Sequence, residues 1–230
     1  MKKLAKKYEA ALKLVDSSKL YTVEEAAALV KKTSTAKFDA SVDVSLHLNV
    51  NPTLADQLIR GTITLPHGNG KSKKILVVTN SKLDEAKESG ADYFGGKEML
   101  EKITRENWFD FDIIVATPDM MGELGKMGRV LGPKGLMPNP KTGTVTMDIK
   151  GAVADIKKGK IAYRVDRDGN LSISAGRVSF DEAKLVENIT AFLDAIVKAR
   201  PSTVKGTYIL NAAISSTMGP AIAITFSGRN

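Results

Sequence analysis

Apolar residues occupy every second position of segment 41–50, where they alternate with Ser, Asp, His and Asn. A period of two predicts a half-buried strand, typical of an antiparallel sheet with one solvated face. The same style returns after residue 160, where segments 161–166 and 171–174 flank a turn at 167–169 and are expected to form a hairpin. Two further strands are expected, near 207–215 and at 221–226.

Capping boxes mark the starts of two helices in these outer parts of the chain. Residues 1–33 are expected to be helical apart from a break near Leu20, and the box Thr22–Glu25 starts a helix that ends near Lys32. The box Ser179–Glu182 starts a long amphipathic helix that ends before Pro201.

The middle of the chain has a different rhythm. Segments 74–79 and 111–117 are continuous apolar runs, which predict strands covered on both faces. Helical segments lie between and after these runs, so a small parallel sheet with helices on its faces is expected. The expected helices are 81–89, 97–107 and 148–158.

Two Gly-containing joints, at 66–70 and 158–160, separate the middle of the chain from its ends. The strand at 41–50 has no antiparallel partner nearby in sequence, so its partners are expected after residue 160. We therefore expect an α+β split domain, an antiparallel sheet with helices formed by residues 1–67 and 160–230. It carries an inserted α/β domain at 68–159, and two covalent crossings make a hinge plausible.

Composition and charge narrow the function. With 43% hydrophobic residues among 230, the chain can bury a sizeable core and is not a disordered tail. Its formal charge of +8 attracts polyanions, of which nucleic acid is the commonest, although many soluble proteins are mildly basic. The absence of Cys excludes disulfides, thiolate zinc sites and thiol nucleophiles, and fits a reducing cytoplasm. No apolar window suggests a membrane span, so a soluble cytoplasmic protein is expected.

No enzyme is expected from the candidate chemistry, and neither a catalytic residue nor a metal site nor a cofactor is assigned. His47 falls on the polar face of a strand and His67 in a joint, so no metal cluster or Ser–His pair is apparent. Gly70-Lys71-Ser72 resembles the end of a phosphate loop, but Leu65 stands where that motif requires Gly. A nucleotide-dependent enzyme that uses the inserted domain as its cofactor site is the alternative.

A glycine-rich segment between residues 122 and 141 is the strongest local oddity, with Gly recurring every three or four positions from Gly122 to Gly135. On a helix this spacing costs stability, and two interpretations stay open. The glycines could allow close packing of a helix on the sheet. Alternatively, a stiff Pro-rich loop could present Lys134, Lys141 and open backbone amides to a phosphate chain.

Three further groups have both a structural and a functional interpretation. Met218 in the turn 217–220 must point either into the core or at a partner. Phe38, next to Lys37, could pack in the core or stack on a nucleotide. Arg164, Asp166 and Arg167 lie on the expected hairpin, where a solvated hairpin would look the same.

The segment Met127-Gly-Arg-Val-Leu-Gly-Pro-Lys-Gly-Leu-Met-Pro-Asn-Pro140 closely resembles the signature of large-subunit ribosomal protein one, the mobile-stalk ribosomal protein, bacterial type. Few other families carry Gly-Pro-Lys-Gly-Leu-Met-Pro. Thr217-Met-Gly-Pro220 and Lys37-Phe38 are similar to the other marks of that family, and the resemblance covers essentially the whole chain. It implies the same split α+β domain, with an inserted domain of the Rossmann-like α/β type.

The resemblance also implies partners. Members of the family bind large-subunit rRNA, form a flexible stalk, assist release of deacylated tRNA from the exit site, and repress their own operon mRNA. A ribosome-associated protein, monomeric when free, is expected. Secondary RNA contact is implied for Lys134 and Lys141. The split domain is expected to supply the main RNA surface through Lys37, Phe38, Ser41, Arg164, Asp166, Arg167, Thr217, Met218 and Gly219.

Overall fold

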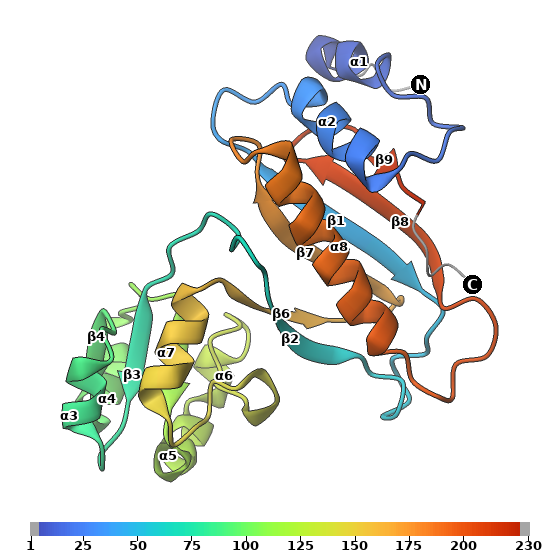
Figure 1. The fold of residues 1–230 in the computed structure, drawn as a ribbon. Helices are drawn as coiled ribbons and strands as arrows, with labels where there is room; N and C mark the ends of the chain where they lie inside the picture. Colours follow the sequence, from blue (N-terminus) through green and yellow to red (C-terminus); the bar gives the residue numbers. More distant parts are fainter. Residues whose placement is uncertain (1–4, 226–230) are drawn as a thin grey trace. The chain divides into compact units, whose positions relative to one another are not determined.

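A computed structural model describes residues 5–225, which divide into two compact units (Figure 1). The first unit combines the described residues before Lys71 with those after Lys160. None of the described helices is long and apolar enough to cross a membrane. The elements of the first unit are α1 (Lys6–Leu12), α2 (Val23–Thr33), β1 (Ser41–Leu48), β2 (Arg60–Thr64), β6 (Lys160–Arg164), β7 (Asn170–Arg177), α8 (Glu182–Lys198), β8 (Ile209–Ser216) and β9 (Ile222–Ala223).

The first unit is built on a four-stranded antiparallel sheet in the order β7-β1-β8-β9. Both neighbours of the central strand come from beyond residue 160, as the isolated alternation of 41–50 predicts. Val44 lies opposite Ile173 on one side and Ile214 on the other. Of the strand expected at 221–226, Ile222 and Ala223 form β9, and residue 226 lies outside the described residues.

One face of this sheet is covered by α2 and α8, which lie across it (Figure 1). The alternate residues of β1 that face these helices are buried, and they share a core with Leu185, Ile189 and Phe192 of α8. The capping box at the start of α2 is present, because Thr22 Oγ1 accepts the Glu25 N–H and the Glu25 carboxylate accepts the Thr22 N–H. The long amphipathic helix is confirmed as α8, but its expected capping box is wrong. Its N-cap is Asp181 without a side-chain cap bond, and Ser179 is hydrogen-bonded to Asp39 instead.

The expected hairpin at 161–174 is not a simple two-stranded hairpin, and this prediction is wrong in part. Strand β6 pairs with β2 in a separate two-stranded sheet, whereas β7 pairs with β1. Two backbone bonds close the turn, from Asp166 N–H to Asn170 O at 2.9 Å and from Gly169 N–H to Asp166 O at 3.4 Å. The chain diverges there because β2, which the alternation did not predict, already occupies the edge of β6. The Val165 N–H extends that pairing by donating to Ile59 O.

The second unit, Lys71–Lys160, contains a three-stranded parallel sheet in the order β4-β3-β5. Apolar side chains alternate between two clusters: Leu76 and Val78 face one, and Ile75 and Val77 face the other. Helices therefore cover both faces, as continuous apolar runs predict. Its elements are β3 (Ile75–Val78), α3 (Leu83–Glu88), β4 (Tyr93–Gly95), α4 (Lys97–Glu106), β5 (Ile113–Ala116), α5 (Met121–Lys126), α6 (Gly128–Leu131), α7 (Ile149–Lys157) and the 3₁₀ turns η1 (Pro118–Met120) and η2 (Pro140–Thr142).

The first joint, residues 66–70, is held to the first unit by the buried side-chain amide of Asn188. The Asn188 side chain on α8 is fully buried; its Oδ1 accepts the His67 N–H at 3.1 Å. Its Nδ2 donates to Gly68 O at 2.9 Å and to Ala175 O at 2.7 Å. One side chain therefore satisfies two backbone groups of the joint and one of β7, and fixes where the joint leaves the sheet.

We expect Asn188→Ala to lower the free energy of unfolding by about 3 kcal/mol, because it leaves these backbone groups without their partner. Urea denaturation measures the change. Asn211→Ala, at an exposed position of β8, is the control and should stay within about 0.5 kcal/mol of wild type. Equal losses in the two variants would contradict the anchoring role.

Candidate nucleic-acid interface

Six of the sequence-predicted residues gather at one end of the four-stranded sheet, and we call them the Thr217 cluster: Lys37, Phe38, Ser41, Thr217, Met218 and Gly219. Strand β1 begins at Ser41 where β8 ends, so the two segments meet although they are far apart in sequence. Thr217 N–H donates to Ser41 O at 3.0 Å, and Ser41 N–H donates to Thr217 Oγ1 at 3.1 Å. The two hydroxyls are 2.9 Å apart. These bonds fix the cluster's geometry.

The turn after β8 holds Met218 in a conformation that side chains rarely adopt. Gly219 N–H donates to Ser216 O at 2.8 Å, and Met218 has a φ of 64°. Turns with positive φ at the third position favour Gly or Asn there, so Met costs on the order of 1 kcal/mol. Its side chain is 76% exposed. Of the two interpretations of Met218, the core one is wrong, and a solvent-facing apolar side chain on a strained backbone remains.

Position 219 requires Gly because Ser216 lies too close for a side chain there. A Cβ at this position would collide with Ser216 Oγ and lie 3.3 Å from Ser216 O. The turn therefore remains tight only with Gly, and Met218 is carried at its tip.

The segment that carries Lys37 and Phe38 is tied down on its other side. Arg177 Nη1 donates to Asp39 O at 2.9 Å, and the Asp39 carboxylate accepts the Ser179 N–H at 3.1 Å and its hydroxyl at 2.8 Å. Phe38 is 57% exposed, so it does not seed the core. Pattern analysis did not identify Asp39 or Arg177 and interpreted Ser179 only as a helix cap, because partners about 140 positions apart leave no local signal.

The uncovered side of the sheet, which we call the open face, extends from the Thr217 cluster along β1. Ser45 Oγ lies 2.9 Å from Ser172 Oγ, and His47 Nδ1 lies 2.8 Å from Asn170 Oδ1. Between its ends the face contains mostly small polar side chains, and Arg177 pairs opposite Ser41 at the end nearest the Thr217 cluster. Its residues are Ser41, Asp43, Ser45, His47, Asn170, Ser172, Ser174, Asn211, Ala213 and Ser215.

Arg164, Asp166 and Arg167 lie at the opposite end of β1, where His47 pairs with Asn170. The separation from the Thr217 cluster is the length of β1, about 24 Å at roughly 3.4 Å per residue. The structure therefore brings the predicted site residues together in two groups rather than one. The open face connects these groups.

The Asp166 carboxylate accepts hydrogen bonds from within its own turn. Its Oδ1 accepts the N–H groups of Asp168 at 2.9 Å and Asn170 at 2.7 Å, and its Oδ2 accepts Asn170 Nδ2 at 3.2 Å. The N–H of Asn170 is the main reason that the pKa of Asp166 lies below its usual value. Asp166 thus shapes the turn that presents Arg167, whereas both arginines are exposed.

The glycine-rich segment of the second unit does not serve close packing along its first half. A Cβ added at Gly122, Gly125 or Gly128 would meet nothing within 4 Å, so these positions face open space. Lys134 Nζ lies 3.9 Å from the centre of the Phe109 ring, a cation–π contact that the expectation of an outward lysine did not include. Lys141 is exposed in η2, where its N–H donates to Asn139 Oδ1 at 2.9 Å.

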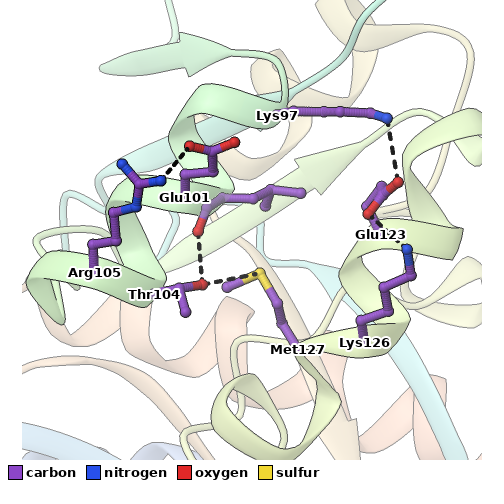
Figure 2. A pocket seen from close by; sticks show the side chains of 8 residues that line it. Lys97, Glu101, Thr104, Arg105, Glu123, Lys126 and Met127 are labelled. Atoms are coloured by element: carbon purple, nitrogen blue, oxygen red, sulfur yellow. Dashed lines mark hydrogen bonds and ion pairs between the residues drawn. The ribbon is translucent and has the colours of Figure 1, made fainter.

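The second unit also contains a pocket of about 420 Å³ between α4 and α5. Its charges are matched: Lys97 and Lys126 both reach Glu123, at 3.3 and 3.2 Å, and Arg105 reaches Glu101 (Figure 2). Among residues 5–225 no group of three potential metal ligands occurs. The pocket therefore lacks the unpaired phosphate-binding cations that the cofactor alternative needs.

Fold and surface together define an α+β protein whose antiparallel sheet presents one polar face with two flanking clusters. Residues 30–220 match the model of the Ribosomal protein L1p/L10e family. The chain is 53% identical over 226 residues to the large ribosomal subunit protein uL1 of Mycoplasma capricolum subsp. capricolum, covering 98% of this chain and 100% of that one. It is 53% identical over 224 residues to the protein of the same name from Mesoplasma florum, covering 97% and 99%. The chain belongs to the ribosomal protein L1p/L10e family.

We expect Met218→Gly to raise the free energy of unfolding by about 0.5–1 kcal/mol, because Gly adopts positive φ without strain. Urea denaturation measures the change. The matched control is Met147→Gly, at a methionine that is 52% exposed and has no positive φ. The control should lose about 0.5 kcal/mol or more through added chain entropy. A loss of similar size in both variants would argue against strain at Met218.

Proposed function

We propose that this chain is a structural rRNA-binding protein of the large ribosomal subunit. The observation that carries the proposal is the exposed, strained Met218 in a tightly bonded cluster, in a chain that is 53% identical to large-subunit relatives over nearly its whole length. Strain of this kind persists when the surrounding structure enforces it, and it concentrates at binding sites.

The open face and the Thr217 cluster suit the shape of RNA. A-form RNA presents a wide, shallow minor groove lined by 2′-hydroxyls, and proteins recognise it by shape and by contacts to these hydroxyls. Serine hydroxyls and the Asn170 amide donate and accept hydrogen bonds without protruding, so a groove can lie against them. Gly219 allows close approach, Met218 packs on sugar, and Phe38 stacks on a base. Lys37, Arg164 and Arg167 supply salt-sensitive affinity for phosphates.

The proposal includes a finer role, which the resemblance to the family supports. The chain forms the mobile stalk that assists release of deacylated tRNA from the exit site, and represses translation of its own operon mRNA through the same surface. It is cytoplasmic and ribosome-associated, and monomeric when free. The second unit is an inserted Rossmann-like domain, an assignment supported by parallel strand order β4-β3-β5 with helices on both faces. Exposed Lys134 and Lys141 make a secondary RNA contact.

We expect Met218→Asp to weaken binding to a large-subunit stalk rRNA fragment more than tenfold, because a carboxylate at the tip of the turn repels phosphates and loses the sugar contact. Filter binding or calorimetry at two salt concentrations measures the affinity, with a scrambled duplex as the RNA control. Met147→Asp introduces the same charge at an exposed methionine of the second unit and should bind within about twofold of wild type.

Fragment-selective wild-type binding that survives moderate salt, with loss in Met218→Asp alone, supports the proposal. Equal, salt-labile binding of wild type to both RNAs would reduce the site to a basic surface and overturn it.

A further inference from the structure

A pocket of about 590 Å³ lies at the end of β1 remote from the Thr217 cluster. The loop after β1 provides one wall through Pro52 and Leu58, and the turn between β6 and β7 provides the other through Arg164, Val165 and Arg167. All of these residues belong to the first unit. The volume falls within the range of small-ligand sites, about 300–1,000 Å³.

The chemistry of the walls is divided. Leu58 is 37% exposed and, together with Pro52, offers an apolar surface to solvent. In residues 5–225 neither Arg164 nor Arg167 forms an ion pair or a hydrogen bond through its guanidinium group. The only carboxylate of the lining, Asp166, is taken up by the N–H groups of its own turn. The pocket thus combines an apolar floor with two free cations.

We propose that this pocket takes one unpaired nucleotide of the RNA that lies on the open face. The base packs against Leu58 and Pro52, and a guanidinium plane stacks on it or pairs with its phosphate. The inference rests on the proposed function and adds to it a second recognition mode. The duplex groove is recognised at the Thr217 cluster, and an unstacked base is held about 24 Å away, the length of β1 at roughly 3.4 Å per residue.

An unpaired nucleotide fits better than paired RNA. Bases inside a duplex are stacked, so only a looped-out or bulged base can enter a concave site. The two arginines complement its phosphate, and Asp166 of the pocket lining is hydrogen-bonded to Asn170, which pairs with His47 on the open face. An acidic peptide would use the same cations, but it would not explain continuity with a hydroxyl-lined face.

The test pairs two neighbouring leucines. Leu58 lines the pocket, whereas Leu54 on the same loop is 46% exposed and does not. We expect Leu58→Asn to bind the stalk rRNA fragment about tenfold more weakly than wild type, because the apolar packing of the base on Leu58 is lost. Leu54→Asn should bind as wild type does. Leu58→Met, which preserves the apolar floor, should retain wild-type affinity. Urea denaturation verifies that all three variants fold.

Fragments with a single abasic site at each unpaired nucleotide in turn identify the bound base. One abasic fragment should bind wild type about tenfold more weakly, yet bind Leu58→Asn no more weakly than the intact fragment does, because both changes remove the same contact. Undiminished affinity of Leu58→Asn, or additive losses at every abasic position, would overturn the pocket assignment while leaving the Thr217 cluster intact. If wild type does not prefer the fragment over a scrambled duplex, the proposed function falls and this inference falls with it.

Discussion

The pairing of β1 with β7 and β8 is the constraint on which the rest of the first unit depends. Strand β1 has no partner near it in sequence, and both of its neighbours come from the far end of the chain. This pairing joins the two halves of the first unit and brings Ser41 against Thr217. It also buries every second side chain of β1 under α2 and α8, which leaves the intervening polar residues on the open face.

The same pairing explains how a strained turn survives. Met218 at positive φ costs on the order of 1 kcal/mol, and an isolated turn would relax. Here Thr217 is bonded to Ser41 through backbone and side chain, and Gly219 is bonded to Ser216. Asp39 holds the neighbouring segment against Ser179. The long-range sheet contacts thus stabilise a local conformation that presents an apolar tip to solvent.

Patterning alone predicts the elements with strong periodicity. The alternation of 41–50 and the absence of a local partner were sufficient to predict β1 and the origin of its neighbours, and the capping box at Thr22 predicted the start of α2. Strand β2 was not predicted, because Arg60–Thr64 contains Gly61, against the Tyr163 ring, and only one strongly apolar side chain. The hairpin was wrong in part for the same reason, since β6 had a partner that the pattern does not reveal.

The candidate residues were also only partly accessible from sequence. The family resemblance nominated residues at both ends of β1, although the hairpin residues form no distinctive motif. The sequence alone indicates neither the distance between the two ends nor the positive φ of Met218. Asp39 and Asn188 act through partners more than a hundred residues away, so only the fold identifies them. The surface that we propose for RNA is therefore the open face together with the two clusters at its ends.

The measurement that tests this account most directly is the affinity of Ser172→Trp for the stalk rRNA fragment. Ser172 is exposed on the open face, opposite Ser45 of the central strand β1, so an indole there would hold RNA away from the sheet. Ser202→Trp, in the exposed loop after α8, is the control. The account predicts that Ser172→Trp binds at least about tenfold more weakly than wild type, with an unchanged free energy of unfolding. The control should bind with wild-type affinity. Wild-type affinity in Ser172→Trp would show that RNA does not lie across this face.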